Sequence, residues 1–219
     1  MTVIPGIIID TTRITLMPMN NQNTLNNINL FTQPSLSKPI RLNALKRLIT
    51  LINKPLSHDY DSQIAKFKSF YTPLLHFLKN DAFHYEKLGN TCTSLFFDQE
   101  TSALVAFCST KCSSLKVKGN TILSLCPSVE IAALCVDDKY RYQGIGQAIL
   151  HHVLHQIQTI RNVVGVQLIT LFAVPPAVDF YKKFGFKKLG TVGKTLYAAA
   201  HQRCVPMYVE VPQKEISEI

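Results

Sequence analysis

The sequence predicts a single α+β domain in which helices flank a central mixed β-sheet. An apolar run at residues 129–136 ends in a glycine-rich turn, an amphipathic stretch follows, and a second apolar run occupies residues 165–174. A strand, a helix and a parallel strand in this order make one right-handed crossover unit. The earlier part of the chain carries helical patterns and a hairpin, whose strands are antiparallel. Together these patterns indicate a sheet with both strand directions.

Prolines and glycines mark where the individual elements end. Pro55 closes the first predicted strand, and Pro73 suits the first turn of a helix, where a backbone N–H is not needed. Gly89 and Gly185 follow helical patterns and can adopt the positive φ of a helix C-terminus. In chain order the expected elements are a strand at 47–52, two helices within 62–88, a hairpin of 92–97 and 103–110, a polar connection at 111–128 with a short strand at 121–125, a strand at 129–136, a helix at 147–160, a strand at 165–174, a short helix at 176–184, and last strands at 186–189 and 204–211.

The N-terminal segment differs in composition from the rest of the chain. It begins with short β-rich runs, but Asn, Gln and Thr dominate residues 20–33, and two prolines follow. This composition is typical of an extended or partly disordered arm. The predicted organisation has three parts, namely an arm (1–40), a folded domain (41–212) and a polar tail (213–219).

The turn at residues 141–146 reads Arg-Tyr-Gln-Gly-Ile-Gly and suits a phosphate group. A helix that starts inside such a turn presents unpaired backbone N–H groups and its positive dipole end at one point. The turn lacks the Gly-Lys-Ser/Thr ending of a nucleoside-triphosphate loop and the glycine spacing of a dinucleotide fingerprint. An ordinary surface loop is the alternative interpretation.

The amphipathic stretch after the turn has one apolar face and one polar face. Its apolar stripe consists of Ile149, Leu150, Val153, Leu154, Ile157 and Ile160. His151 and His155 fall on the opposite face with glutamines, so we expect both to face water. No Glu or third ligand accompanies them, and no metal site is predicted.

The cysteines, the charge and the hydropathy narrow the possible classes of protein. Six scattered cysteines, most of them in apolar runs, predict reduced thiols in the core. The net charge of +9 is concentrated towards the two ends of the chain, which suits a polyanionic ligand but also simple solubility. The chain contains no stretch of about 18 apolar residues and no secretory signal pattern, so we expect a soluble cytoplasmic protein without membrane contact.

Two motifs resemble the GNAT superfamily of acyl-CoA-dependent N-acyltransferases. The turn fits the family's pyrophosphate-binding pattern Arg/Gln-x-x-Gly-x-Gly/Ala, and residues 177–186 are similar to its Ala-x-x-Phe-Tyr-x-x-x-Gly-Phe segment. The order of elements between residues 41 and 211 also matches the family's mixed sheet. The resemblance implies a GNAT fold in which two parallel central strands splay apart. It further implies acetyl-CoA as acyl donor, no metal, and direct transfer to a primary amine in a ternary complex.

The resemblance also implies roles for individual residues. Backbone groups of the strand before the turn would pair with pantetheine, amides of the turn would hold the pyrophosphate, and Arg141 would add positive charge. Tyr181 would protonate the departing thiolate, although it could instead be a core tyrosine. The cofactor-binding residues implied are Leu134, Cys135, Val136, Arg141, Tyr142, Gln143, Gly144, Ile145, Gly146 and Gln147.

Glu130 is the candidate catalytic base. It is the only acidic residue in its apolar strand, and it precedes Gly144 by the interval of the catalytic glutamate in the protein-lysine branch of the family. A carboxylate on a central strand is costly to bury without a purpose or a partner. A structural role for Glu130, or a water molecule as base, stays open. Cys135 should face the opposite side of the strand, which argues against a covalent intermediate.

The acceptor is not fixed by these motifs. Val174 stands where the family often has asparagine, and this departure, with the stretch at residues 77–82, is loosely similar to the bacterial branch of toxin acetyltransferases acting on aminoacyl-tRNA. Lys111, Lys116 and Lys118, together with the C-terminal lysines, would give a tRNA acceptor a basic rim. A small or peptide amine, aminoacyl-tRNA, and a non-catalytic CoA-binding interaction module all remain open, as does a homodimer.

Overall fold

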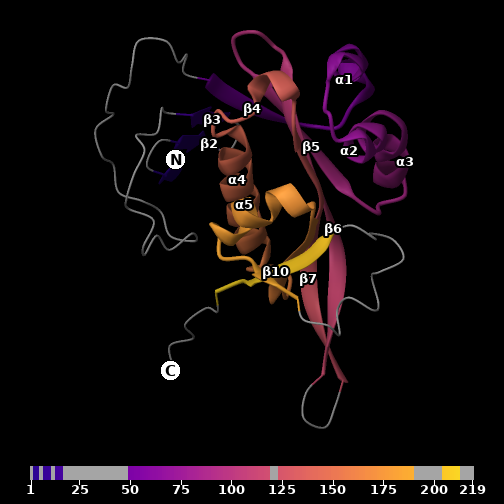
Figure 1. The fold of residues 1–219 in the computed structure, drawn as a ribbon, viewed down its shortest axis with the longest axis vertical. Coiled ribbons are helices and arrows are strands. Elements are labelled where there is room, and N and C mark those ends of the chain that lie inside the picture. The colour runs from indigo at the N-terminus through magenta and orange to yellow at the C-terminus, as the bar shows by residue number, and fades with distance from the viewer. Residues whose placement is uncertain are drawn as a thin grey trace. The chain divides into compact units, whose positions relative to one another are not determined.

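The computed structural model of the chain describes residues 2–4, 7–10, 13–16, 49–118, 123–189 and 204–212. The elements, labelled as in Figure 1, are β1 (Thr2–Ile4), β2 (Ile7–Asp10), β3 (Arg13–Leu16), β4 (Ile49–Pro55), η1 (His58–Tyr60), α1 (Asp61–Lys66), α2 (Thr72–His76), η2 (Phe77–Asp81), α3 (Ala82–Lys87), β5 (Cys92–Asp98), β6 (Leu104–Lys118), β7 (Leu123–Val136), η3 (Asp138–Tyr140), α4 (Ile145–Ile160), β8 (Leu168–Ala173), η4 (Pro175–Ala177), α5 (Val178–Lys182), β9 (Lys187–Lys188) and β10 (Val205–Glu210).

The strands form a mixed sheet, as the sequence predicts. Among the described residues, ten strands pair in the order β1-β2-β3-β4-β5-β6-β7-β8-β10-β9. β7 and β8 run parallel, which is the crossover expected from the strand, turn and helix pattern, whereas β4 and β5 pair antiparallel, as do β8 and β10. β3 pairs with β4, so the β-rich runs near the N-terminus extend the sheet. The predicted domain boundaries stay a prediction, because residues 17–48 and 213–219 lie outside the described part of the chain.

The chain divides into two compact units, and the division falls inside β6, β7 and α4. The first unit comprises residues 1–109 and 133–155. Its core gathers apolar side chains from α1, η2, β5, β6 and the end of β7. These are Ile64, Phe67, Leu78, Leu95, Phe97, Leu104, Phe107, Ala133 and Cys135. Because side chains alternate along a strand, Phe96 points to the other face of β5, where its ring contacts His152 of α4 with centroids 6.0 Å apart. In this unit the short helices and α4 therefore cover opposite faces of the sheet.

The second unit comprises residues 110–132 and 156–219. Within it β8 lies between β7 and β10, and its pattern is almost entirely buried, as expected for a central parallel strand. Gly185 ends the helical segment with φ +80°, and Phe184 and Phe186 on either side of it are buried. The glycine therefore serves the helix stop that the sequence predicts. The expected segment between the last two strands, residues 196–202, lies outside the described residues.

The prediction of a polar connection at residues 111–128 is wrong. β6 continues to Lys118 and β7 begins at Leu123, so two strands of 15 and 14 residues replace most of it, and no separate strand exists at 121–125 within the described residues. Pro127 lies inside β7, where its carbonyl accepts the Gln167 N–H at 2.9 Å. Pro127 is tolerated there because the parallel register with β8 begins one residue later, at Ser128, so the missing proline N–H does not interrupt it.

Candidate functional site

The glycine-rich turn has the backbone geometry of a phosphate site. β7 ends at Val136, and α4 begins at Ile145, two residues earlier than predicted. Between them Tyr142 and Gly144 have φ of +61° and +82°, so the chain turns sharply just before α4, whose first N–H groups have no partner within the helix. A Cβ on Gly144 would meet only Gln147 Oε1, at 3.9 Å, so the space above the turn is open. These features fit the pyrophosphate of CoA.

The residues of the turn differ in how they can contribute. Tyr142 and Gln143 are exposed, whereas the Ile145 side chain is buried and leaves only its backbone for a ligand. The Gln143 amide group donates to the Lys139 carbonyl at 3.0 Å, which braces the turn. Gly146 and Gln147 are partly exposed in the first turn of α4. The turn therefore offers mainly backbone N–H groups, as the phosphate interpretation requires.

Arg141 lies between two exposed aromatic rings. Its guanidinium carbon is 4.1 Å from the ring centroid of Phe70 and 5.2 Å from that of Tyr142. One of its nitrogens lies 4.0 Å from the Asp138 carboxylate. Phe70 is 64% exposed and Tyr142 is 92% exposed. The sequence predicted a positive charge at this point but not the aromatic ring that Phe70 brings to it.

β7 extends beyond the residues that pair with β8 in parallel register. The parallel register between the two strands ends at the pair Ile131 and Leu171, although β7 continues to Val136. Leu134 and Val136 are partly exposed, and Cys135 is buried. The Cys135 thiol donates to the Ser69 hydroxyl at 3.3 Å, and burial raises the pKa of this thiol.

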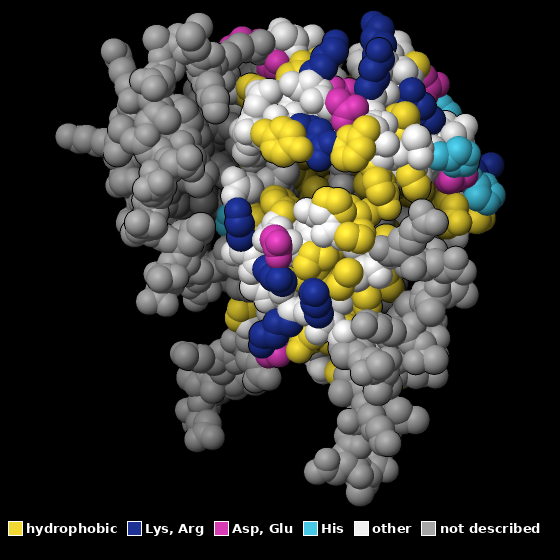
Figure 2. Space-filling view, in the orientation of Figure 1, with side chains coloured by type: hydrophobic (Ala, Val, Ile, Leu, Met, Phe, Trp, Pro, Cys, Tyr) yellow, Lys and Arg dark blue, Asp and Glu magenta, His cyan; other side chains and the backbone are white. Residues whose placement is uncertain are grey.

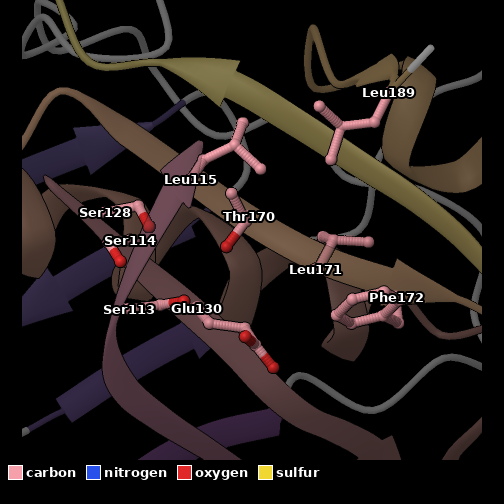
Figure 3. Close-up of a pocket in the computed structure, with 9 residues that line it drawn as sticks. All are labelled: Ser113, Ser114, Leu115, Ser128, Glu130, Thr170, Leu171, Phe172 and Leu189. Atoms are coloured by element: carbon pink, nitrogen blue, oxygen red, sulfur yellow. The ribbon is translucent and has the colours of Figure 1, made fainter. Parts of the chain in front are cut away.

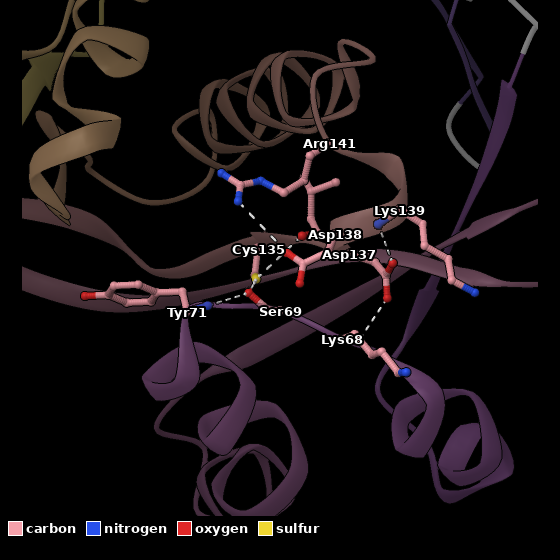
Figure 4. Close-up of polar contacts among 9 residues, drawn as sticks. Lys68, Ser69, Tyr71, Cys135, Asp137, Asp138, Lys139 and Arg141 are labelled. Atoms are coloured by element: carbon pink, nitrogen blue, oxygen red, sulfur yellow. Dashed lines mark hydrogen bonds and ion pairs between the residues drawn. The ribbon is translucent and has the colours of Figure 1, made fainter.

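Asp137 connects the end of β7 to the loop between α1 and α2. Its carboxylate accepts the Lys68 N–H at 2.8 Å and the Lys139 N–H at 3.0 Å, and the side chain is only 5% exposed. Asp138 donates its N–H back to the Lys68 carbonyl at 3.0 Å. Figure 4 shows these contacts together with the Cys135 to Ser69 bond. Sequence reasoning missed this arrangement, because its partners are far apart along the chain.

Glu130 is buried and has a cationic partner. Its carboxylate lies 3.0 Å from Lys111 Nζ, and the residue is 4% exposed. Both belong to the second unit, where Glu130 borders a small pocket formed by β6, β7 and β8 (Figure 3). The buried Ser128 hydroxyl has no hydrogen-bond partner among the described residues. Lys111, which the aminoacyl-tRNA alternative would place on a basic rim, is thus paired with Glu130.

Tyr181 is a buried side chain of α5. It is 8% exposed, and its ring meets Phe180 edge-on with centroids 5.0 Å apart and Phe186 at 5.7 Å. Its backbone carbonyl accepts the Phe186 N–H at 3.3 Å, which closes the helix end. The packing is that of a core tyrosine in an aromatic cluster, and the role of Tyr181 as an acid stays a prediction. Lys182 pairs with Asp179 at 2.8 Å on the surface.

Two expectations about His and Cys residues need correction. His151 does not simply face water, because it is only partly exposed and burial lowers its pKa to about 4. Cys92 and Cys112 are exposed, so the prediction of core thiols holds for Cys108 and Cys135 but not for these two. Within the described residues no group of three or more His, Cys, Asp or Glu side chains is arranged to hold a metal ion. None of the described helices is both long and apolar enough to cross a membrane.

Comparison with known proteins finds one matching family profile and several solved structures of similar fold. A family profile described as Acetyltransferase (GNAT) domain matches residues 95–188. No curated protein sequence matches the chain. A solved structure described as a bacterial toxin is 19% identical, with a TM-score of 0.62, and the match covers 74% of this chain and 90% of that one.

Two further structures are of the toxin AtaT. A tyrosine-to-phenylalanine mutant of AtaT, bound to the C-terminus of the antitoxin AtaR and to acetyl-CoA, is 16% identical with a TM-score of 0.60, over 74% of this chain and 93% of that one. AtaT complexed with acetyl-methionyl-tRNAfMet is 16% identical with a TM-score of 0.58, over 71% and 93%. These matches confirm the predicted mixed α+β fold and the resemblance to GNAT acetyltransferases.

Proposed function

We propose, from the premise that residues 95–188 of this chain are a GNAT acetyltransferase domain, that the protein transfers an acetyl group to a primary amine. Acetyl-CoA supplies the activated thioester. The observation that carries the proposal is the open turn before α4, with Gly144 at φ +82°. The transfer is direct, in a ternary complex, because the buried Cys135 thiol with its raised pKa is a poor nucleophile.

The turn and the end of β7 are the proposed binding site of acetyl-CoA. Backbone N–H groups from Gln143 to Gln147 donate hydrogen bonds to the pyrophosphate oxygens, and Arg141 contributes positive charge. The backbone of Leu134, Cys135 and Val136 pairs with the pantetheine arm. The test is a Gly144→Glu variant, which adds bulk and negative charge above the turn and should abolish acetyl-CoA binding. Unchanged affinity would remove the pyrophosphate from this turn.

Tyr181 and Glu130 are the proposed acid and base. The Tyr181 hydroxyl gives its proton to the departing thiolate, and the aromatic contacts of its ring hold it in one orientation. The Glu130 carboxylate takes the proton of the attacking amine, directly or through a water molecule in the small pocket that it borders. The motif position of Tyr181 and the burial of Glu130 support these roles.

The experiment that tests this function combines binding with turnover. Calorimetry with acetyl-CoA is followed by a thiol-release assay on amines, peptides and aminoacyl-tRNA, using the wild type and Tyr181→Phe. We expect binding in both proteins and a loss of kcat of about 10²-fold or more in the variant, because only the proton donor is removed. Binding without turnover on any acceptor would favour a CoA-binding interaction module. Full activity of Tyr181→Phe would assign the acid elsewhere.

Aminoacyl-tRNA is the acceptor class with the most support. AtaT, whose fold this chain shares, was solved in complex with acetyl-methionyl-tRNAfMet. The net charge of +9 is also suited to a polyanionic acceptor. If aminoacyl-tRNA is the acceptor, its turnover should fall steeply with added salt, whereas turnover of a small amine should not. Similar salt dependence for both acceptors would contradict this choice.

A further inference from the structure

An exposed stack of two aromatic rings and one guanidinium stands beside the glycine-rich turn. Arg141 lies 4.1 Å from the centroid of Phe70 and 5.2 Å from that of Tyr142, and both rings are largely exposed. Hydrophobic and basic side chains lie next to one another in this way on the face shown in Figure 2. Single exposed apolar side chains are common in proteins. Two rings on a common cation are a more specific arrangement, since each face of a ring can also stack on a flat ligand.

Hydrogen bonds and backbone geometry fix the two chain segments that carry the rings. The Lys68 N–H donates to the Asp137 carboxylate on one side of Phe70, and on the other side the Tyr71 N–H donates to the Ser69 hydroxyl at 3.1 Å. Ser69 also accepts the Cys135 thiol, so the loop that carries Phe70 is joined to β7 at several points (Figure 4). Tyr142 keeps φ at +61°, a region that residues with a side chain rarely adopt. The chain thus maintains an unfavourable backbone conformation at an exposed tyrosine.

We propose that Phe70, Arg141 and Tyr142 form the subsite for the adenosine end of acetyl-CoA. This inference rests on the proposed function, because it takes the turn as the pyrophosphate site. In CoA the adenosine is joined directly to the pyrophosphate, so its base must lie within a few bonds of whatever holds that group. Adenine is flat and stacks well on aromatic rings and on guanidinium. The free N–H donors of Arg141 suit the phosphate on the ribose.

The charges around the stack agree with this occupant. A guanidinium has five N–H donors, and one nitrogen of Arg141 lies 4.0 Å from the Asp138 carboxylate. This distance is too long for a close ion pair, so Arg141 keeps positive charge for a ligand. The stack also belongs entirely to the first compact unit, like the turn itself. The pyrophosphate site and the proposed adenosine subsite therefore lie on residues 135–147 and on the α1–α2 loop, whose Lys68 N–H donates to Asp137.

The test compares acetyl-CoA with S-acetyl-4′-phosphopantetheine, which lacks the adenosine, the phosphate on its ribose and one phosphate of the pyrophosphate. Dissociation constants of both are measured by calorimetry for the wild type, Phe70→Ala, Tyr142→Ala and Tyr142→Phe. We expect each alanine variant to bind acetyl-CoA about tenfold more weakly and to bind the analogue as the wild type does, because stacking on a base is lost. Tyr142→Phe should retain the wild-type affinity for both compounds. Tyr85→Ala, which removes a half-exposed tyrosine from α3, is the matched control and should change neither constant.

Three other outcomes would contradict the adenosine subsite, each for a different reason. If the alanine variants weaken both compounds equally, or neither, the rings do not contact the adenosine and the subsite is wrong. If they raise KM for the amine acceptor and leave the dissociation constant of acetyl-CoA unchanged, the stack belongs to the acceptor site. If the wild type binds neither compound, the proposed function itself fails, and this result is distinct from a failure of the subsite alone. Melting temperatures close to the wild type show that the variants are folded.

Discussion

Gly144 is the residue whose backbone most restricts the choice of side chain in the candidate site. Its φ of +82° is unfavourable for any residue with a Cβ, although nothing but Gln147 lies within 4 Å of that position. We therefore expect Gly144→Ala to lower the free energy of unfolding by about 1 kcal/mol through backbone strain alone. Gly165→Ala is the matched control, since Gly165 has no positive φ and no neighbour within 4 Å. Chemical denaturation measures both, and equal effects would contradict the strain argument.

Lys111 is expected to stabilise the fold by compensating the buried charge of Glu130. The two groups are 3.0 Å apart, and Glu130 is 4% exposed. Lys111→Met leaves a carboxylate without its cation, so we expect a loss of about 2 kcal/mol in the free energy of unfolding. The double variant K111M/E130Q, which carries no buried charge, should recover part of that loss. Lys182→Met breaks an exposed pair with Asp179 and should be nearly neutral.

A double variant less stable than Lys111→Met would contradict this account of the pair. Activity separates the structural role from the chemical one. If Glu130→Gln folds normally and keeps the wild-type rate, then a water molecule or the substrate acts as base, and the Lys111 to Glu130 pair is purely structural.

At the scale of elements, Asp137 joins the α1–α2 loop to the end of β7. Its carboxylate accepts two backbone N–H groups, from Lys68 and Lys139, and is almost fully buried. Asp137→Ala leaves both donors without this partner, so we expect a loss of about 2 kcal/mol and faster amide exchange at both residues. Asp137→Asn keeps one acceptor oxygen, so its free energy of unfolding should fall between those of the wild type and Asp137→Ala. Asp61→Ala, at an exposed carboxylate, is the control and should leave exchange at Lys68 unchanged.

The elements and the contacts between them show what the sequence could and could not predict. Hydrophobic period and glycine positions located β4, β5, α4 and β8, because those signals are local. The motif at residues 141–146 likewise located the turn. The contacts of Asp137 with Lys68, and of Arg141 with Phe70, join residues about seventy positions apart, and no local pattern encodes such pairs. The partner of Glu130 was also missed, because β6 was expected to end before Lys111.

The helix phase gave a correct core stripe but a wrong environment for the histidines. The apolar positions of α4 are buried, apart from Ile160, which is 47% exposed. His152, next to the predicted water-facing His151, is 3% exposed and packs against Phe96 of β5. A stripe of apolar residues shows which face is buried most, but it does not show how wide the covered face is. The width depends on the strands beneath the helix, here β4 and β5.

For the molecule as a whole, these histidines predict that stability falls in mild acid. Burial, aided by the nearby charge of His155, lowers the pKa of His152 from 6.5 to about 4, and burial alone lowers that of His151 to about 4. Because both pKa values are lower in the folded state, the unfolded chain binds more protons between about pH 6.5 and pH 4. The stabilisation is therefore complete above pH 6.5 and is lost as the pH falls through this range. We expect each histidine to account for at most about 3 kcal/mol of the decrease in unfolding free energy over this pH range.

The slope of unfolding free energy against pH distinguishes the histidines from the carboxylates, which titrate mainly at lower pH. His152→Gln keeps a hydrogen-bonding side chain near Asn53, whose amide nitrogen lies 3.3 Å from His152 Nε2, but it cannot be protonated. Denaturation from pH 7 to pH 4 should show about half the wild-type slope in this variant, because His151 remains. His58→Gln, at an exposed position outside α4, is the control and should leave the slope unchanged. A variant slope equal to that of the wild type would mean that His152 takes up its proton over the same pH range in the folded and unfolded chain, and the acid sensitivity would then have to arise at another group.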